Sequence, residues 1–315
     1  MRKLVSVVMA AGLLASLAAC ASTPPTFSSC DSGGNAALVT AKGKFGVDPK
    51  AEFPTPLVAK KAQVAVVNRG DGKAVTGDEG LDVVLSIYNG DTGEALATQS
   101  GPITAVTLRL FVTDGTFPFT EALTCATQGS RVVTTGTASQ LFGSESLGLD
   151  PATTLVVVSD IESTFLGKAN GADQVPQAGY PSVALAPNGR PGLTFSSQDI
   201  PDGLGAIALK QGNGATVKKG DSVIANLTGV VWGAKKTFAS SWDNNAPVTV
   251  TAADLDANGD GLVPGLAKAL IGQKVGSQLL VVVSPDEGYG TAQPPTGVTS
   301  SDTLVFVLDV LGISE

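Results

Sequence analysis

The chain carries one order of short sequence elements twice, and this internal repeat limits the fold more than any other feature of the sequence. Each copy opens on a Gly-x-Gly segment, Gly70–Gly72 and Gly212–Gly214. Each copy closes on an apolar strand-like run, Thr154–Val158 and Thr303–Val307. Because elements repeated in one order indicate repeated structure, we predict two domains of the same fold.

The segments between these ends also match in order, although the match is weak residue by residue. Each copy has a strand-like run, a short helical pattern that ends on a glycine, and an aromatic-Gly pair. The matched segments are Val83–Ile87 with Val223–Leu227, Gly129–Val132 with Gly272–Val275, and Phe142–Gly143 with Tyr289–Gly290.

The second copy specifies its helix well. Apolar residues recur at i, i+4, i+7 and i+8, which places them on one helical face. These residues are Leu262, Leu266, Ala269 and Leu270. Pro264 suits the first helical turn and Gly272 the residue just past the end, while Lys268 is expected to face water.

A second pattern completes the fold class. The continuous apolar run Leu279–Val283 predicts a strand that is covered on both faces. Several strands and one short helix in each copy indicate the α+β class. We predict two domains, each an antiparallel sheet wrapped around a short helix.

Stretches rich in Ser, Thr, Gly and Pro divide the chain. They predict a mobile tether near the N-terminus and a linker between the domains. The linker is long for a connection without structure, so part of it can lie along a domain surface. The predicted limits are a leader over 1–19, a tether over 20–61, a first domain over 62–162, a linker over 163–203 and a second domain over 204–315.

The N-terminus has the pattern of a bacterial secretion signal. Arg2 and Lys3 precede the apolar core Leu4–Leu17, and Leu17–Cys20 matches the lipobox, whose cysteine receives diacylglycerol. An ordinary signal peptide that is cut nearby is the alternative. No later stretch of the sequence has the 18 or so apolar residues that a membrane helix needs. We expect a lipid anchor at Cys20 on the extracytoplasmic face of the cell membrane.

Composition excludes several function classes. The sequence has no histidine, which removes the usual general base, the Ser-His and Cys-His nucleophile pairs and the commonest zinc ligand. We expect neither a metal nor a cofactor. The formal net charge of -8 argues against a nucleic-acid partner. An oxidising compartment would permit a disulfide between Cys30 and Cys125, and the sequence leaves open whether it forms.

Four sequence islands follow one another near the C-terminus. They are Asn226–Gly229, Phe238–Ser241, Ser284–Gly290 and Thr303–Phe306. Together they resemble the FKBP family of peptidyl-prolyl isomerases. The resemblance implies a sheet wrapped over a helix and an apolar pocket that grips proline and rotates the preceding peptide bond. Such chemistry needs shape and exclusion of water more than an acid or a base.

The resemblance also implies which residues form this pocket. Phe238, Tyr289 and Phe306 match the aromatic residues to which we assign the catalytic role, and the Tyr289 hydroxyl matches one that contacts ligand carbonyls. Six further residues are predicted to contact the substrate: Leu262, Val263, Leu266, Leu227, Trp242 and Val248. Singly, each position suits an ordinary core residue, and their order along the chain favours a pocket. Trp242 is new to the pattern and either covers part of the pocket or packs at the surface.

Five positions depart from the family pattern. Ala239 replaces an Asp, and Leu227 replaces the Tyr that bonds to that Asp, so neither partner is left buried alone. Leu266 stands at the position of a Trp on the pocket floor, Val248 at that of a second Phe, and Asn244 at that of an Arg. These changes predict weak binding of tacrolimus-like ligands without removing a desolvating pocket.

The first copy departs further from the pattern. Phe142 stands at the Tyr position, Val157 at the last-strand Phe position, and Phe119–Glu121 at the helix start. We predict that the first domain is structural or binds peptides, without catalysis.

One competing motif bears on metal binding. Asp254–Asp260 resembles the start of a calcium loop of the EF-hand type. Gly265 stands where that loop needs a bidentate Glu, and the preceding residues have a strand pattern. A polar turn before the helix is the favoured interpretation.

Three functions follow from these observations. The first is a monomeric, lipid-anchored isomerase that acts on proline-containing exported polypeptides. The second is a non-catalytic lipoprotein that binds proline-containing segments or scaffolds envelope proteins, which the missing pocket residues favour. A solute-binding lipoprotein of a transporter is weaker, because two small repeated halves do not resemble a two-lobed clamp.

Overall fold

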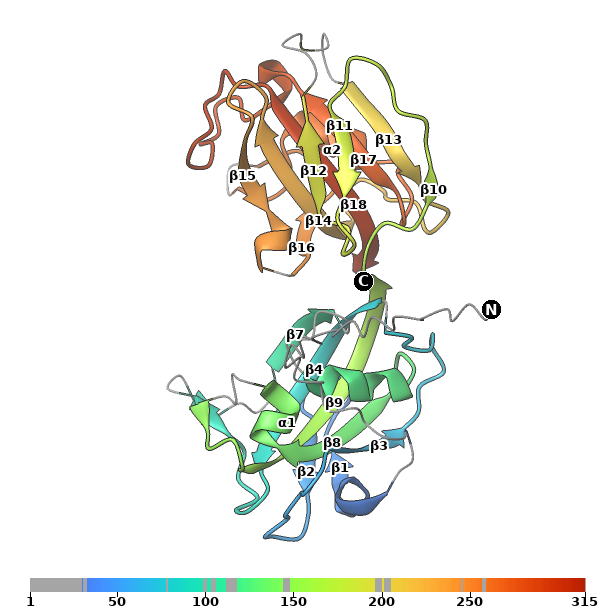
Figure 1. The fold of residues 1–315 in the computed structure, drawn as a ribbon, viewed down its shortest axis with the longest axis vertical. Helices are drawn as coiled ribbons and strands as arrows, with labels where there is room; N and C mark the ends of the chain where they lie inside the picture. Colours follow the sequence, from blue (N-terminus) through green and yellow to red (C-terminus); the bar gives the residue numbers. More distant parts are fainter. Residues whose placement is uncertain are drawn as a thin grey trace, which may run out of the picture.

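A computed structural model describes residue 30 and residues 33–314, with gaps at 78, 99–100, 103–105, 112–117, 144–147, 196–199, 201–204, 245 and 257–258. Figure 1 shows two domains stacked along the long axis, with the earlier residues in one and the later residues in the other. The predicted lipobox lies outside the described residues.

The first domain is built on a five-stranded antiparallel sheet with the order β3-β8-β9-β4-β7. Its elements are η1 Gly34–Leu38, β1 Thr40–Lys42, β2 Lys50–Glu52, β3 Gln63–Asn68, β4 Glu79–Asn89, β5 Ala97–Thr98, β6 Gly101–Pro102, β7 Val106–Phe111, η3 Pro118–Cys125, β8 Arg131–Thr137, α1 Ala138–Phe142 and β9 Thr154–Leu166.

The second domain is built on a seven-stranded antiparallel sheet with the order β10-β13-β17-β18-β14-β15, and β16 also pairs with β14. Its elements are β10 Ala172–Asp173, β11 Ser182–Leu185, β12 Pro191–Thr194, β13 Gly205–Gln211, β14 Ser222–Val231, β15 Lys236–Ser240, η5 Ser241–Asn244, β16 Val248–Thr251, α2 Pro264–Leu270, β17 Gln278–Val283, η6 Pro285–Glu287 and β18 Leu304–Ser314. Both domains pair an antiparallel sheet with a short helix, which confirms the α+β class.

The helix of the second domain follows its sequence signals. Pro264 occupies the first turn of α2, and Gly272 lies past its end with a φ of 89°, a conformation that glycine adopts without strain. Leu266 and Leu270 are buried, and Lys268 is exposed as predicted. Burying each leucine stabilises the fold by about 1.5–3 kcal/mol, so packing rather than intrinsic propensity holds this short helix.

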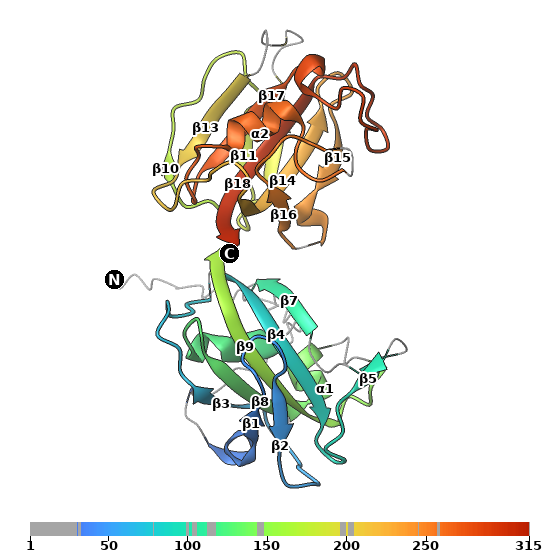
Figure 2. The same ribbon diagram turned by 180° about the vertical axis from the view of Figure 1, so that it is seen from behind.

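Each sheet is buried on both faces, by its helix on one side and by a hairpin on the other. In the second domain, alternate residues of β17 pack under α2 or against Tyr180, Val183, Leu193 and Phe195 of the β11–β12 region. In the first domain, η1 and the β1–β2 hairpin cover the face opposite η3 and α1. Figures 1 and 2 show the β11–β12 hairpin of the second domain on the same side of the molecule as the helices of the first domain.

These hairpins lie in segments that the sequence assigned to the tether and the linker. Ala36, Val39 and Leu57 are buried against the first sheet. In the 163–203 segment, β10 pairs with β13, and the β11–β12 hairpin packs on the second sheet. Buried apolar side chains and backbone pairing therefore hold much of both segments on the domains.

Backbone hydrogen bonds correct the register of the internal repeat. In the first domain the N–H of Gly129 donates to the carbonyl of Ile161. In the second domain the N–H of Gly276 donates in the same way to the carbonyl of Val310. The hydroxyls of Ser130 and Ser277 accept hydrogen bonds from Gly70 and Gly212, the glycines that open the two copies. Gly129 thus corresponds to Gly276 and not to Gly272.

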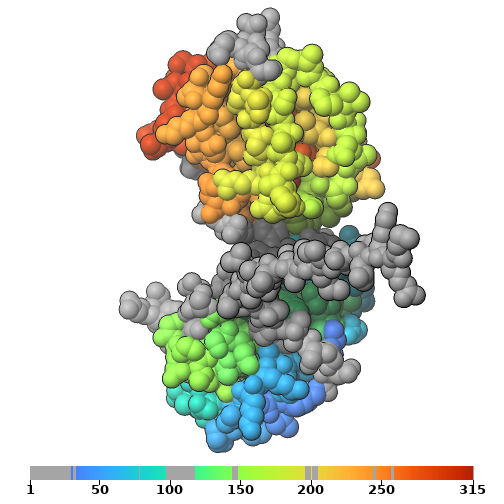
Figure 3. Space-filling view, viewed as in Figure 1, coloured from blue at the N-terminus to red at the C-terminus, as the bar shows by residue number. Residues whose placement is uncertain are grey.

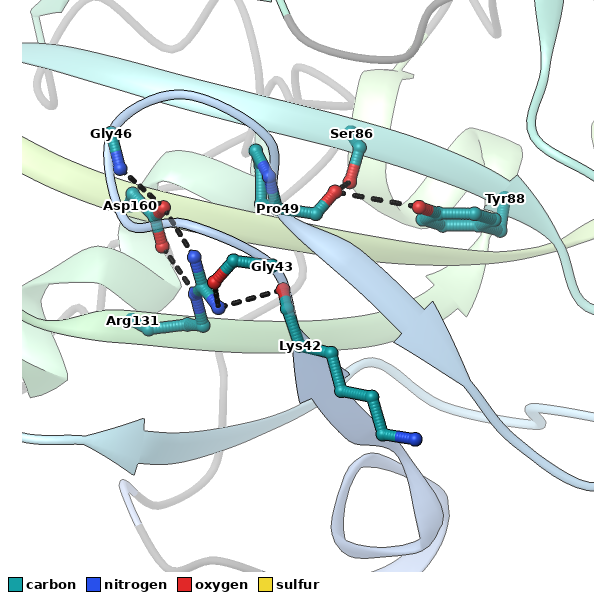
Figure 4. A network of polar contacts seen from close by, with 8 residues as sticks. All are labelled: Lys42, Gly43, Gly46, Pro49, Ser86, Tyr88, Arg131 and Asp160. Carbon is teal, nitrogen blue, oxygen red and sulfur yellow. Dashed lines mark hydrogen bonds and ion pairs between the residues drawn. The ribbon is translucent and has the colours of Figure 1, made fainter.

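A buried ion pair holds the first hairpin to the first sheet (Figure 4). Arg131 of β8 donates to both carboxylate oxygens of Asp160 of β9, at 2.6 and 2.7 Å. The guanidinium also donates to the carbonyls of Lys42 and Gly43, and Asp160 accepts from the N–H of Gly46. Both side chains are at most 4% exposed, so each charge depends on the other for its stabilisation.

We predict that Arg131→Ala destabilises the first domain by about 3–5 kcal/mol, because it leaves the Asp160 carboxylate buried without a cation. Urea unfolding would measure the loss. Lys42→Ala is the matched control, since it breaks only the exposed Lys42–Glu52 pair and should change stability little. Equal midpoints for the two variants would contradict the role of the buried pair.

The second domain places Asp309 at the position of Asp160 but Gln278 at that of Arg131. In both domains these two residues face each other across the pair formed by the last strand and its neighbour. Asp309 accepts from the Gln278 amide at 2.7 Å and from the N–H of Ala169 at 3.2 Å. Burial raises the pKa of Asp309 to about 6, and the two hydrogen bonds and Lys210 only partly offset this.

This pKa predicts how stability depends on pH. It lies above the value of about 3.9 for an unfolded chain, so the folded state keeps the proton between about pH 4 and pH 6. Stability therefore falls as the pH rises through that window, by up to about 3 kcal/mol for a shift of roughly two units. Asp309→Asn should abolish this slope and stabilise the protein at pH 7, because the Gln278 amide can turn to accept from the new amide.

Urea midpoints measured from about pH 4 to pH 7 would test this prediction. Asp71→Asn, a change at an exposed aspartate, is the control and should leave the slope unchanged. A fall in Asp309→Asn as steep as in the unmodified chain would contradict the assignment.

A disulfide joins Cys30 to Cys125 at the end of η3, which settles the question that the sequence left open. Within the part of the chain that the structure describes, none of the helices has the length and apolar character required to cross a membrane.

Candidate active site

The site is built around a bulge that carries Phe238. Between β14 and β15, Gly229 pairs with Ala239 and Val230 pairs with Thr237, which leaves Phe238 as the extra residue of β15. A bulge re-aims the side chain of its extra residue. Here it directs Phe238 onto the apolar cluster that α2 shares with the sheet.

Gly229 provides the space that Phe238 occupies. A Cβ atom on Gly229 would lie 2.7 Å from the ring carbon Cζ of Phe238, closer than two such atoms can approach. Gly229 also pairs with Phe306 of β18 across the sheet. The rings of Phe238 and Phe306 meet edge to face, with centroids 5.8 Å apart and planes at 82°. The missing side chain of Gly229 thus permits an aromatic pair, a geometry that favours ring contact.

The segment leading into α2 forms the base of this cluster. Leu262 and Val263 precede the helix, and Leu266 follows within its first turn. All three are buried, Leu266 almost completely. Backbone hydrogen bonds between Leu262 and Ala253 and between Leu255 and Leu262 fix the approach to the helix.

Tyr289 lies at the edge of the cluster. It follows η6 and precedes Gly290, whose φ of 54° makes the turn that the Tyr-Gly pair indicated. Its side chain is half-buried, and burial raises the pKa of the phenol above its ordinary value. The hydroxyl therefore stays protonated at neutral pH and can donate a hydrogen bond.

The structure brings most of the predicted site residues together. Four are buried members of one cluster and three are half-buried residues packed against it. These residues are Phe306, Leu262, Val263 and Leu266, with Phe238, Tyr289 and Leu227. They form one apolar cluster, with the half-buried phenol of Tyr289 packed against it.

The other two predicted residues, Val248 and Trp242, are not among the residues of this cluster. Val248 is half-buried in β16, where it pairs with Ala225. Trp242 is half-buried in η5, and the tip of its indole lies against Gly189 in the turn of the β11–β12 hairpin, 3.1 Å from where a Cβ would be. The structure thus places Trp242 in surface packing with this hairpin.

Ser241 supports the site, and the sequence analysis gave it no role. Its hydroxyl donates to Oδ1 of Asn226 at 3.0 Å and accepts from the N–H of Leu227 at 3.0 Å. It is buried and ties the end of β15 to β14 next to the Phe238 bulge. The signals were present, since Asn226 and Ser241 belong to two of the quoted islands.

The corresponding region of the first domain is filled. Ile87 pairs with Val157 there, at the positions of Gly229 and Phe306. Phe119 and Phe142 are buried, and their ring centroids are 5.2 Å apart. Ile87, Phe119 and Phe142 belong to one buried core cluster of the first domain.

The acidic loop before α2 forms a hydrogen-bonded turn. The N–H of Asp256 donates to the carbonyl of Asp260, and the N–H of Asp260 donates back to Oδ1 of Asp256. Among the described residues, no group of three or more His, Cys, Asp or Glu is arranged to hold a metal ion.

Comparison with known proteins decides the family. The family model for FKBP-type peptidyl-prolyl cis-trans isomerases matches residues 214–311. FK506-binding protein 1 of Yarrowia lipolytica is 32% identical over 115 residues, which cover 36% of this chain and 99% of that protein. The chain belongs to the FKBP-type peptidyl-prolyl cis-trans isomerase family.

Other members match over shorter shares of their length. The FKBP-type peptidyl-prolyl cis-trans isomerase FkpA of Escherichia coli K12 is 29% identical over 111 residues, 35% of this chain and 38% of FkpA. The chain thus spans less than half of the length of this FKBP relative. The crystal structure of FkpA aligns with a TM-score of 0.31 at 25% identity, over 42% of this chain and 51% of that one.

Within this FKBP-type domain, we predict that Gly229→Ala displaces the Phe238 ring. The added methyl group cannot fit 2.7 Å from a ring carbon, so the bulge must shift, at a cost of about 1–3 kcal/mol. Near-ultraviolet circular dichroism and urea unfolding would report both effects. Gly233→Ala is the control, because a Cβ there meets open space. Unchanged spectra in Gly229→Ala would contradict the proposed fit.

Proposed function

We propose that the second domain is a peptidyl-prolyl cis-trans isomerase that acts on proline-containing segments of exported polypeptides. The observation that carries the proposal is the edge-to-face pair of Phe238 and Phe306 above Gly229, joined to the buried base made by Leu262 and Val263. Family membership gives the reaction class, and this cluster supplies the groups that such a reaction uses.

The physical task is to lower a rotation barrier. Amide resonance sets this barrier at about 18–20 kcal/mol and places negative charge on the carbonyl oxygen, which water stabilises. An apolar site withdraws that water and so favours the twisted, less polar amide. The aromatic pair can hold the proline ring, while the protonated phenol of Tyr289 can donate to a carbonyl next to the rotating bond. No proton needs to move.

We propose that this activity is extracytoplasmic and tied to the membrane by a lipid on Cys20. The basic residues and apolar core before Cys20 support export. The disulfide between Cys30 and Cys125 agrees with an oxidising compartment. We further propose that the first domain does not catalyse, because Ile87 stands at the position of Gly229 and Val157 at that of Phe306.

A non-catalytic binding role is the second candidate. Ala239 and Leu266 favour it, since both stand where family members carry a larger or charged pocket residue. Binding of a proline peptide without acceleration of its isomerisation would distinguish this role from catalysis.

A prolyl isomerisation assay on the full chain tests the proposal. We expect acceleration over the uncatalysed exchange, which takes roughly 10–100 s. Phe238→Ala should lower kcat/KM by tenfold or more, because it removes the ring contact and its buried area, worth about 2 kcal/mol or more. Tyr289→Phe should lower it by about two- to tenfold, the worth of one hydrogen bond.

Phe45→Ala is the control for this assay, because it removes an exposed phenylalanine of the first domain and should leave kcat/KM unchanged. No acceleration by the unmodified chain would sink the isomerase proposal. Equal rates for Phe238→Ala and the unmodified chain would show that another site acts.

A further inference from the structure

The β11–β12 hairpin precedes the segment that the family model matches, yet it is part of the second domain. It belongs to the 170–195 segment, whereas the match begins at residue 214. Phe195 meets Trp232 edge to face at 5.1 Å, and Val183 and Leu193 pack on the same strands. Figure 3 shows this segment in yellow-green, spread over one face of the domain beside the orange segment that contains η5.

The turn of this hairpin reaches η5. Arg190 forms an ion pair with Asp243 at 2.6 Å, between Nη2 and Oδ1. The residues just before these two also meet, since Gly189 of the turn lies against the tip of the Trp242 indole of η5. Two consecutive residues of the turn therefore contact two consecutive residues of η5.

The turn is itself well fixed. The N–H of Ala186 donates to the carbonyl of Arg190, and the N–H of Arg190 donates to Oδ1 of Asn188. Lys168 donates to the carbonyl of Pro187 at 3.3 Å. Gly189 has a φ of 98°, which disfavours any other residue there. A fixed turn can restrain the element that it contacts.

η5 is joined directly to the Phe238 bulge. It begins at Ser241, the residue after β15 ends, and the Ser241 hydroxyl ties that point to Asn226 and Leu227 of β14. A displacement of η5 would therefore pull on β15 three residues from Phe238.

We propose that Arg190 is a positioning residue for the site. It holds η5 through the ion pair with Asp243, and η5 in turn holds the Phe238 bulge. The proposal rests on the proposed isomerase function for its kinetic effect but not for its structural effect. Arg190 does not need to touch the substrate. It acts from the sheet face opposite α2, so its contribution lies outside the apolar cluster.

The expected effects are modest, because both partners are about half exposed, at 48% and 58%. Exposed ion pairs of this kind change equilibria by about 1.4- to 5-fold. Arg190→Ala should lower kcat/KM within that range. It should also speed amide hydrogen exchange in residues 236–244. Roughly 1 M salt screens the pair, so the unmodified chain should approach the variant in high salt while the variant stays unchanged.

The experiment uses the full chain and measures exchange by mass spectrometry alongside kcat/KM. Compared with Arg190→Ala, Arg190→Lys should restore part of the exchange protection and of kcat/KM. The double variant with Arg190→Asp and Asp243→Arg should restore more of both than Arg190→Asp alone or Asp243→Arg alone. Lys42→Ala, which breaks an exposed pair in the first domain, is the control and should alter neither readout. A merely structural role for Arg190 would lower the urea midpoint without faster exchange in residues 236–244.

Unchanged exchange in residues 236–244 of Arg190→Ala would overturn the positioning role, whatever the activity. Faster exchange there, with rescue by the charge-swapped pair, would support it. If the unmodified chain fails to accelerate isomerisation, the proposed function fails while the exchange data still decide the role of Arg190. The fluorescence emission of Trp242 can be obtained as the difference between the spectra of the chain and of Trp242→Phe. In Arg190→Ala this emission should move to longer wavelength, and an unchanged emission wavelength would contradict the proposal.

Discussion

Burial of both faces of each sheet is the constraint on which the rest of the structure depends. A short helix can cover only one face, so the strands of a lone sheet-and-helix unit would leave apolar residues in water. In each domain a hairpin outside the main sheet supplies the second cover, η1 with the β1–β2 hairpin in one and the β11–β12 hairpin in the other. Complete burial of β17 follows from this double cover.

The two domains differ at a sheet position on which the candidate site of the second domain depends. The two domains share equivalent backbone hydrogen bonds, such as those that the N–H groups of Gly129 and Gly276 donate to the last strand of each sheet. One difference between them is side-chain volume at a sheet position, where Ile87 in the first domain corresponds to Gly229 in the second. With a glycine there, a bulge can direct Phe238 inward, whereas the isoleucine closes the space.

Local sequence patterns predicted the parts of the fold that depend on interactions between residues close together in the sequence. Pro264 and Gly272 mark the ends of α2, the unbroken apolar run marks β17, and the ordered islands indicate a cluster that the structure assembles from distant strands. For the linker, the sequence indicated only that part of it can lie along a domain surface, because prolines and glycines such as Pro187 and Gly189 indicate a loop by composition. The burial of the hairpin side chains depends on contacts with residues far along the chain. Trp242 could not be oriented from the sequence for the same reason, since its neighbour lies in the hairpin.

The disulfide has a geometric consequence for where the protein can work. If Cys20 carries the proposed lipid, only ten residue steps (30 − 20) separate the anchor from Cys30, which the disulfide holds to the first domain. Even when fully extended, that length spans at most about 33–36 Å. With that proposed anchor, the first domain would stay within roughly one domain diameter of the bilayer. The polypeptides within its reach would be those emerging at the membrane surface, before they diffuse away.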